Sequence, residues 1–259
     1  MDLGISGRKA IVCASSRGLG KGCALALAQA GCDIVLNGRD EAVLADAARE
    51  IARRTDVTIT PVAADVSTLQ GQAALLEACP EPDILVNNNG GPPLRDFREL
   101  SRADMLEGVT QNMVAPIELI QKTLDGMMAR GFGRIVNITS LSVYMAIPGL
   151  DLSSGARAGL TAFVAGIARA AAARNVTINN LLPGKMDTDR IKSGLAFSMR
   201  QANISEEEAR ARLIGPIPAG RLGTPEEFGA LCAFLCSVHA GYITGRNFPV
   251  DGGLNPVAF

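Results

Sequence analysis

Aromatic side chains and histidine are scarce in this chain. Phe, Tyr and Trp together make up 4% of its 259 residues, Trp is absent, and His239 is the single histidine. A zinc site or a histidine-based catalytic triad would therefore have little to work with. The core must instead be aliphatic and rich in alanine, which suits helices packed against a buried parallel sheet.

Excess charge and long apolar runs are also missing. The formal net charge is −1, so we expect no general attraction to nucleic acid or to anionic membranes. No apolar run reaches a membrane-spanning length, and residues 1–9 do not form a signal peptide. These features predict a cytoplasmic protein with no nucleic-acid or membrane partner.

The six cysteines form no C-x-x-C pair. Cys232 and Cys236 are spaced one helical turn apart, with His239 nearby, so a metal site is one interpretation. Buried, reduced thiols on an apolar helix face are the favoured interpretation, and we predict no bound metal.

What the chain does contain is a regular alternation of short apolar segments and helical segments. The strands are expected at 9–14, 33–37, 57–62, 83–87, 134–140, 176–181 and 247–250. Between them we expect helices from the glycine turn to about residue 30, and at 40–54, 67–78, 101–128, 153–173 and 225–236. Asp40, Ser67 and Asp151 are the expected N-caps, and Pro116 the expected kink. This order predicts one α/β domain spanning residues 1–259, a doubly wound parallel sheet (Rossmann fold) with helices on both faces.

A glycine turn lies between the first strand and the first helix. Glycine lets the backbone approach a pyrophosphate, which the free N–H groups of the helix N-terminus then bind. The usual first glycine of such a turn is replaced by Ala14, and a turn that only packs the helix is an alternative. Asp65 and Val66 after the third strand, and Asn88 and Gly90 after the fourth, favour a nucleotide site. The turn itself comprises Ser15, Ser16, Arg17, Gly18, Leu19 and Gly20.

The charge around the second strand indicates which cofactor is bound. A carboxylate that binds the ribose diol normally ends this strand, but here the residue is Asn37. Arg39 follows closely, and Arg17 lies in the glycine turn. Two guanidinium groups without a carboxylate suit a 2′-phosphate, so NADP(H) is predicted over NAD(H). The alternative is that Arg39 is only a solvated turn residue.

Taken together, these motifs resemble the short-chain dehydrogenase/reductase family over essentially the whole chain, and most closely its branch of 3-oxoacyl-acyl-carrier-protein reductases. The segments that carry the resemblance are the glycine turn, 65–66, 87–90, 176–184 and 242–253. The resemblance implies a seven-stranded sheet in the order 3-2-1-4-5-6-7 and homo-tetramers or dimers packed through the long helices. It also implies a substrate lid at about 185–218, and cofactor contacts from Pro183, Gly184, Met186 and Thr188.

The active site is expected in the stretch 134–160, where a strand end, a loop and a helix start follow one another. The resemblance implies a catalytic Asn, Ser, Tyr and Lys, of which the first two match Asn112 and Ser140. The Tyr position is Ser153 and the Lys position is Arg157, which keeps a positive charge to clamp the ribose. This chain therefore resembles the family in half of the catalytic group and departs from it in the proton donor and its activator.

Three routes to a function remain open. Tyr144 could act as the acid, with Arg157 or Arg134 supplying positive charge, although an exposed or interface aromatic is an equal interpretation of Tyr144. A water held by Ser140, Ser153 and Arg157 could instead protonate the alkoxide. Alternatively, the chain has lost hydride transfer and is a nucleotide-binding protein with a binding or regulatory role.

The substrate side is expected to hold a rigid wall at 90–93 and a lid that closes an apolar pocket. Ordinary helix packing would explain the same apolar lid residues. Our prediction is an NADP(H)-dependent oxidoreductase that interconverts a carbonyl, in a 3-oxoacyl or other ketone substrate, and a secondary alcohol. The lid residues are Met186, Ile191, Leu195, Phe197, Met199, Ile204 and Leu213.

Overall fold

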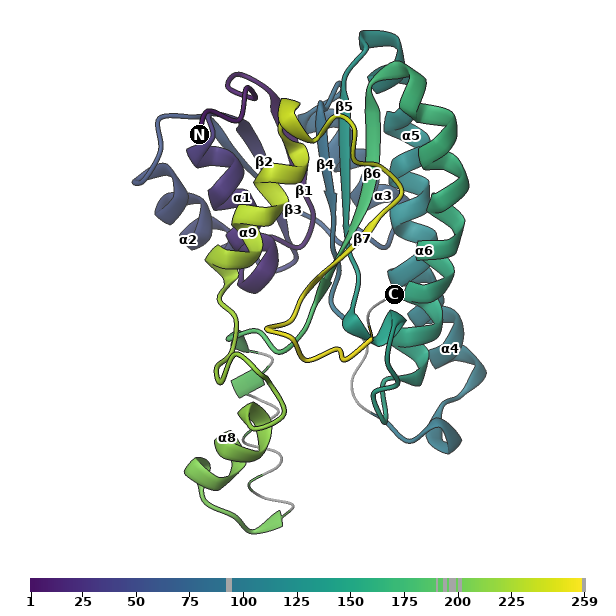
Figure 1. Cartoon of the computed structure of the whole chain (residues 1–259). Helices are drawn as coiled ribbons and strands as arrows, with labels where there is room; N and C mark the ends of the chain where they lie inside the picture. The colour runs from purple at the N-terminus through teal and green to yellow at the C-terminus, as the bar shows by residue number, and fades with distance from the viewer. Residues whose placement is uncertain (92–94, 190, 193–194, 196–198, 200–201, 258–259) are drawn as a thin grey trace.

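Seven parallel strands form a single sheet in the order β3-β2-β1-β4-β5-β6-β7 (Figure 1). The computed structural model describes residues 1–91, 95–189, 191–192, 195, 199 and 202–257. The predicted number and order of strands are confirmed. The strands are β1 (Lys9–Val12), β2 (Asp33–Gly38), β3 (Ile59–Ala63), β4 (Ile84–Asn87), β5 (Gly133–Ile138), β6 (Val176–Pro183) and β7 (Asn247–Val250).

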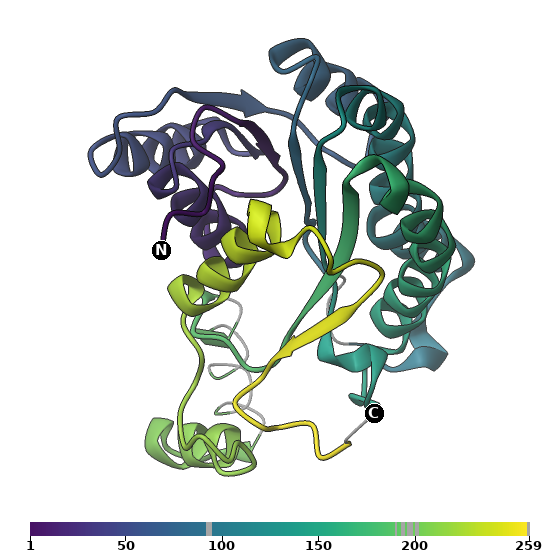
Figure 2. The same ribbon diagram turned by 45° about the horizontal axis from the view of Figure 1, so that its top comes forward.

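Helices cover both faces of the sheet and bury two separate cores (Figures 1 and 2). One face carries α1 (Gly18–Gln29), α2 (Glu41–Ala52) and α9 (Pro225–Cys236). The other carries α3 (Leu69–Ala78), α4 (Arg102–Val109), α5 (Ala115–Arg130) and α6 (Asp151–Ala171). Helix α8 (Glu206–Ile214) lies apart from both layers, beyond the carboxyl ends of the strands (Figure 1).

The cysteines are buried thiols, as predicted. All six are free and buried, and burial raises the pKa of Cys13 and of Cys32 to about 12. Cys23, Cys232 and Cys236 lie in the core between α1 and α9. Within the described residues, no group of three or more His, Cys, Asp or Glu side chains is arranged to hold a metal ion.

Two of the predicted helix caps are wrong. Thr68, not Ser67, caps α3, because its Oγ1 accepts a hydrogen bond from the Gly71 N–H at 3.0 Å while the Ser67 hydroxyl donates to Asp65. Asp151 lies inside the first turn of α6, and the cap position belongs to Leu150, which makes no side-chain capping bond. The Asp40 cap is confirmed, with its Oδ1 accepting from the Val43 N–H at 3.1 Å.

The helix expected at 101–128 is interrupted by a π-helical turn over Thr110–Val114, between α4 and α5. The interruption ends beside Pro116, the expected kink. Pro116 has no N–H group to donate to the carbonyl four residues earlier, which breaks the regular α-helical pattern. The Ala115 N–H bonds to the Thr110 carbonyl instead, and the wider turn places Asn112 in the irregular segment.

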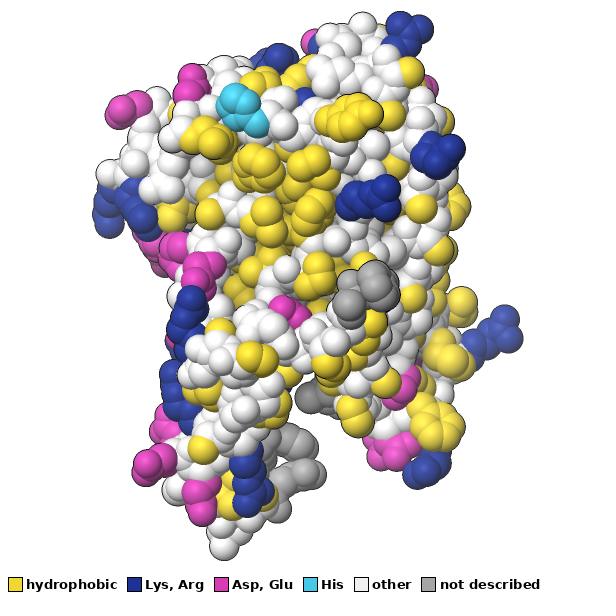
Figure 3. Space-filling model, in the orientation of Figure 1, with side chains coloured by type: hydrophobic (Ala, Val, Ile, Leu, Met, Phe, Trp, Pro, Cys, Tyr) yellow, Lys and Arg dark blue, Asp and Glu magenta, His cyan; other side chains and the backbone are white. Residues whose placement is uncertain are grey.

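Apolar side chains also gather on the surface over α9 and β7, on the face toward the viewer in Figure 3. They belong to a partly buried fringe of the core that includes Leu231, Phe234, Ile243 and Phe248. None of the described helices is both long and apolar enough to cross a membrane.

Candidate active site

The glycine turn follows β1 and bends sharply into α1. Ala14 has a φ of +43°, a left-handed conformation that favours glycine, which explains why glycine is usual at this position. A Cβ atom on Gly20 would lie 2.4 Å from the Ala14 carbonyl oxygen, so only glycine fits there. The backbone at Gly20 therefore still packs closely against the backbone of Ala14, although Ala14 carries a methyl group.

Asn37 and Ser15 brace this turn against the neighbouring strands. Asn37 is 1% exposed; its Oδ1 accepts from the Ala14 N–H at 3.0 Å, and its Nδ2 donates to the Val62 and Ala64 carbonyls. The Ser15 hydroxyl donates to the Val12 carbonyl at 2.6 Å. Asn37 is thus occupied within the protein and does not replace the diol-binding carboxylate.

The charged groups near this turn are solvent-exposed. Arg17 begins α1 at its N-cap position without a side-chain capping bond, and Arg39 follows the end of β2; both are exposed. Ser16 lies beside the end of β2, because a Cβ atom on Gly38 would be 2.9 Å from its hydroxyl oxygen. Leu19 packs against the core. The two guanidinium groups therefore have the exposure that contact with a 2′-phosphate requires.

Asp65 is held as an ionised acceptor at the end of β3. Its Oδ1 accepts from the Ser67 N–H at 2.9 Å and from the Ser67 hydroxyl at 2.6 Å. Burial acts to raise the pKa of Asp65, but the two Ser67 donors and the nearby Arg39 outweigh it and hold that pKa below its usual value. The next residue, Val66, is 5% exposed.

The ends of β4 and β6 reach the same edge of the sheet. Asn88 Nδ2 donates to the Ala14 carbonyl at 3.0 Å, and no atom of a described residue lies within 4 Å of the place where a Cβ atom on Gly90 would be. Pro183 ends β6, and the N–H of Gly184 donates to the Val250 carbonyl at 3.0 Å. Beyond it, Met186 is 4% exposed.

Thr188 brings the loop after β6 onto the glycine turn. Its Cγ2 is 3.5 Å from the place where a Cβ atom on Gly18 would be, and its hydroxyl donates to the Met186 carbonyl at 3.4 Å. Segments from both halves of the sheet therefore meet at the glycine turn, as a dinucleotide site requires.

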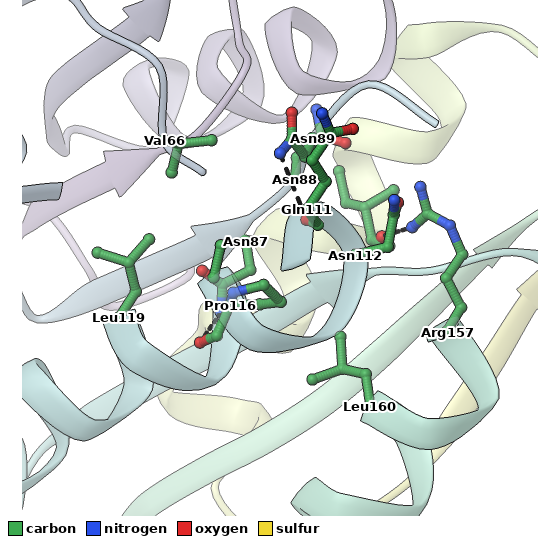
Figure 4. Close-up of a pocket in the computed structure, with 12 residues that line it drawn as sticks. Val66, Asn87, Asn88, Asn89, Gln111, Asn112, Pro116, Leu119, Arg157 and Leu160 are labelled. Carbon is green, nitrogen blue, oxygen red and sulfur yellow. Dashed lines mark hydrogen bonds between the residues drawn. The ribbon is translucent and has the colours of Figure 1, made fainter. Parts of the chain in front are cut away.

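Ser153 and Arg157 form a buried pair on α6. They are 4% and 8% exposed, and Arg157 Nε donates to the Ser153 hydroxyl at 3.2 Å. Arg157 Nη1 donates to the Ile138 carbonyl at 2.6 Å, which ties the helix to the end of β5. The Arg157 side chain extends from α6 toward Asn112 (Figure 4).

Asn112 and Arg157 line one small cavity of about 20 Å³ (Figure 4). Asn112 is 3% exposed, and its Nδ2 donates to the Gly108 carbonyl at 3.0 Å. Its Oδ1 is buried and has no hydrogen-bond partner among the described residues. The cavity has room for about one water molecule.

Ser140 and Tyr144 belong to the loop that follows β5. The Ser140 hydroxyl oxygen accepts from the Ser142 N–H at 3.1 Å and caps the short helix η3 (Leu141–Val143). Tyr144 is 41% exposed and lines a different cavity, of about 530 Å³, rather than the one shared by Asn112 and Arg157.

Arg134 cannot support Tyr144, so that part of the prediction is wrong. Arg134 is the second residue of β5 and lies at the opposite edge of the sheet from Ser140. It is 1% exposed, and its guanidinium donates to the Ser237 and Asn175 carbonyls. His239 is also away from the site, with its Nε2 2.8 Å from the Asp2 carbonyl oxygen.

Sequence reasoning missed a ladder of four asparagines across β4, β5, β6 and β7. Each amide Nδ2 donates to the Oδ1 of the next: Asn87 to Asn137 at 2.9 Å, Asn137 to Asn180 at 3.0 Å, and Asn180 to Asn247 at 2.8 Å. The four residues are direct partners in the sheet register. The available signal was an asparagine within each of four apolar strands.

The substrate side is described only in part. Pro92 and Pro93 of the expected wall, and Phe197 of the lid, lie outside the described residues. Helix α8 begins with a capping box between Ser205 and Glu208. Lys185 Nζ donates to the Leu213 carbonyl at 2.8 Å and so ties the loop after β6 to the end of α8.

Comparison with known proteins gives consistent matches over the whole chain. Residues 13–255 match the family described as Enoyl-(Acyl carrier protein) reductase. The NADPH-dependent reductase BacG of Bacillus subtilis is 32% identical over 96% of this chain and 98% of its own length. The 3-oxoacyl-acyl-carrier-protein reductase FabG of Aquifex aeolicus is 31% identical over 98% of this chain and 100% of its own. The structure of L-sorbose reductase from Gluconobacter frateurii, complexed with NADPH and L-sorbose, superposes with a TM-score of 0.92 at 30% identity, covering 98% of each chain.

Proposed function

Because this chain belongs to the short-chain dehydrogenase/reductase family, we propose that it is an NADP(H)-dependent oxidoreductase that interconverts a ketone and a secondary alcohol. The relatives named as NADPH-dependent reductases support both the enzyme class and the cofactor. The observation that carries the proposal is the meeting of Thr188, Asn88 and the glycine turn at one edge of the sheet. Arg157 and Asn112 lie at that same edge.

The residues at this edge fit a dinucleotide. Gly20 lets the turn pack closely, because a Cβ atom there would clash with the Ala14 carbonyl oxygen, and among the described residues no atom lies within 4 Å of the Cβ position on Gly90. We assign the phosphates to the turn that ends in Gly20, the 2′-phosphate to Arg17 and Arg39, and the nicotinamide ribose to Arg157. When bound, the cofactor supplies the hydride, so the protein has to orient the carbonyl and supply a proton.

Ser140 and Ser153 are proposed to orient the carbonyl oxygen by donating hydrogen bonds to it. Each of these hydroxyls accepts a bond in the structure, from Ser142 N–H and from Arg157 Nε, which leaves its own O–H free to donate. The Arg157 guanidinium adds positive charge through Ser153, but it stays protonated and cannot relay a proton. The proton must therefore come from another group.

Tyr144 is proposed as that acid, with a water held by the two serines as the alternative. Tyr144 follows Ser140 by four residues and lines the cavity next to the site. Its phenol is a stronger acid than an alkyl hydroxyl, and a positioned acid contributes about 100- to 10,000-fold to a rate.

The Tyr144→Phe variant tests this assignment. We expect kcat to fall by about 100-fold or more with an unchanged Kd for NADPH, because the phenol acts on the carbonyl rather than on the cofactor. Tyr242→Phe is the matched control, since Tyr242 is the second of the two tyrosines and is fully exposed. A Tyr144→Phe enzyme with wild-type kcat would leave the water as the proton source.

A cofactor-binding protein without catalysis is the second candidate. The observation that favours it is the buried Ser153–Arg157 pair, which offers no acid stronger than an alkyl hydroxyl. NADPH consumption with a panel of ketones and 3-oxoacyl thioesters separates the two functions. Turnover of any member supports the oxidoreductase, whereas tight NADPH binding without turnover supports the binding protein.

We also propose a homo-tetramer or homo-dimer, formed through the outer faces of the long helices. Large apolar side chains are exposed there, and covering them would remove apolar surface from water. Cytoplasmic localisation stays a prediction. The exposed apolar residues are Met105, Leu106, Val114 and Phe163.

A further inference from the structure

The larger cavity beside the candidate active site is the size of a ligand pocket. It is an open depression of about 530 Å³ between the 142–148 loop and the first turn of α6. Pockets that hold small molecules usually enclose about 300–1,000 Å³. The cavity is therefore large enough to contain most of a small substrate.

The cavity and the active site are built from the same two stretches of chain. Ser142, which lines the cavity, donates its backbone N–H to the Ser140 hydroxyl. On α6, Asp151 and Ser154 line the cavity, while Ser153 and Arg157 bond to each other and Arg157 lines the smaller cavity. A molecule in the larger cavity would thus lie next to the groups proposed to orient its carbonyl.

Ser142 lines this cavity, and its unsatisfied hydroxyl lies behind the cavity wall. The residue is 7% exposed, and its Oγ is buried with no hydrogen-bond partner among the described residues. Buried hydroxyls in native proteins are normally hydrogen-bonded, and those that are not need an explanation. A change of the Ser142 χ1 rotamer would turn this hydroxyl toward a ligand in the cavity, and a polar group of the ligand would then supply the missing partner.

Asp151 gives the cavity a negative charge. Its carboxylate does not cap α6, and it has no hydrogen-bond or ion-pair partner within the described part of the chain. The Ser154 hydroxyl donates to the Leu150 carbonyl at 2.9 Å, so its oxygen remains available as an acceptor. Among the residues that the structure describes, those that line the cavity include no Lys or Arg. The cavity therefore suits a ligand that donates hydrogen bonds and carries no negative charge.

We propose that this cavity binds the hydroxylated part of a small polyhydroxy ketone, with Asp151 and Ser142 determining specificity. A carboxylate can accept hydrogen bonds from adjacent hydroxyls, as it does from a ribose diol in dinucleotide-binding folds. The Ser142 hydroxyl would bond a further hydroxyl of the same molecule. The apolar side chains between residues 143 and 148 would cover its carbon skeleton. This proposal rests on the proposed function, because it names the ketone that the site reduces.

The test compares ketoses of three to six carbons with the unhydroxylated ketones of the same chain length, using NADPH. The wild type is expected to prefer the ketoses. Asp151→Asn and Ser142→Ala should each lower kcat/KM for the preferred ketose by about tenfold or more, mainly through KM, since hydrogen bonds to substrate hydroxyls are lost. Both variants should leave the unhydroxylated ketone within about twofold of wild type, because that substrate makes no such bonds.

Glu226→Gln is the matched control for charge. Glu226 is exposed in the first turn of α9, so the substitution removes the same charge from a helix N-terminus that does not line the cavity. Two results would overturn the proposal: a wild-type preference for unhydroxylated ketones or 3-oxoacyl thioesters, or an Asp151→Asn enzyme with unchanged kinetics on ketoses.

Calorimetric titration separates this proposal from the proposed function. The ketose panel is titrated into the NADP⁺-loaded wild type and into the NADP⁺-loaded Asp151→Asn variant. If no ketone is reduced but a ketose binds to the wild type and at least tenfold more weakly to the variant, the cavity assignment stands while the proposed function fails. If no ketose binds, the cavity assignment is wrong whatever the enzyme reduces.

Discussion

Arg157 does more than supply a positive charge at its position. Its planar guanidinium donates in two directions, from Nε to the Ser153 hydroxyl and from Nη1 to the Ile138 carbonyl. An ammonium group offers no such fixed fork. The residue therefore joins the start of α6 to the end of β5 and also sets the direction in which Ser153 can donate. Exchanging Arg157 for Lys alone would remove this tie without providing a stronger acid.

Arg39 is the residue that most directly tests the proposed cofactor preference. Arg39→Ala should weaken NADPH binding by about tenfold or more and leave the Kd for NADH nearly unchanged, because a charge-assisted bond to the 2′-phosphate is lost. Titration of each nucleotide by fluorescence measures both constants. Arg53→Ala, at the far end of α2, is the control. Equal weakening of NADPH and NADH would contradict the assignment.

At the scale of elements, the strands were predicted well because each is a short apolar run between turn residues. Their ends were less predictable: β1 and β5 stop at Val12 and Ile138, two residues before the expected ends, where the chain turns into the site. The α3 cap was misassigned because Ser67 and Thr68 are adjacent, and only the contact of Ser67 with Asp65 decides between them.

The candidate site also has a part that local sequence patterns indicate and a part that depends on contacts between distant segments. The proposed cofactor residues belong to local motifs, so their positions along the chain could be proposed from the sequence. The asparagine ladder could not, because it depends on the register of four strands that are far apart in sequence. The separation of Tyr144 from Arg157 depends on how the 142–148 loop packs, which no local pattern describes.

The ladder should act as one stabilising unit. The Asn137→Leu variant leaves the Asn180 Oδ1 without its donor in the core, and the Asn180→Leu variant leaves the Asn137 Nδ2 without its acceptor. Each substitution should therefore lower the free energy of unfolding by about 1–3 kcal/mol. The double variant removes both partners of that bond, so it should cost less than the sum of the two single losses.

Denaturant unfolding of the four proteins measures this coupling. Thr177→Val on β6 is the control, because the buried Thr177 hydroxyl has no hydrogen-bond partner among the described residues. We expect that variant to be neutral or slightly stabilising, because it removes a buried polar group that makes no bond. Additive losses in the ladder variants would show that the amides act independently.

At the scale of the whole molecule, the proposed cofactor site joins segments that are distant in sequence. Saturating NADPH, at about 100 times its Kd, should stabilise the folded protein by about 2.7 kcal/mol and raise Tm by about 5–10 °C. Differential scanning fluorimetry with and without NADPH checks this, with NADH at the same concentration as the comparison. An unchanged Tm at saturating NADPH would argue against a cofactor site at this edge.

The asparagine ladder has a direction, and one backbone carbonyl sets it. Asn87 Nδ2 donates to the Pro116 carbonyl at 3.4 Å as well as to Asn137. A flipped Asn87 amide would place two oxygens against each other there, so the remaining amides must follow the same orientation. The Asn87 Oδ1, which has no partner among the described residues, is thereby held as an acceptor in a residue that lines the small cavity. The orientation of the Asn87 amide beside that cavity and the orientation of the Asn247 amide, three strands away, are therefore fixed together.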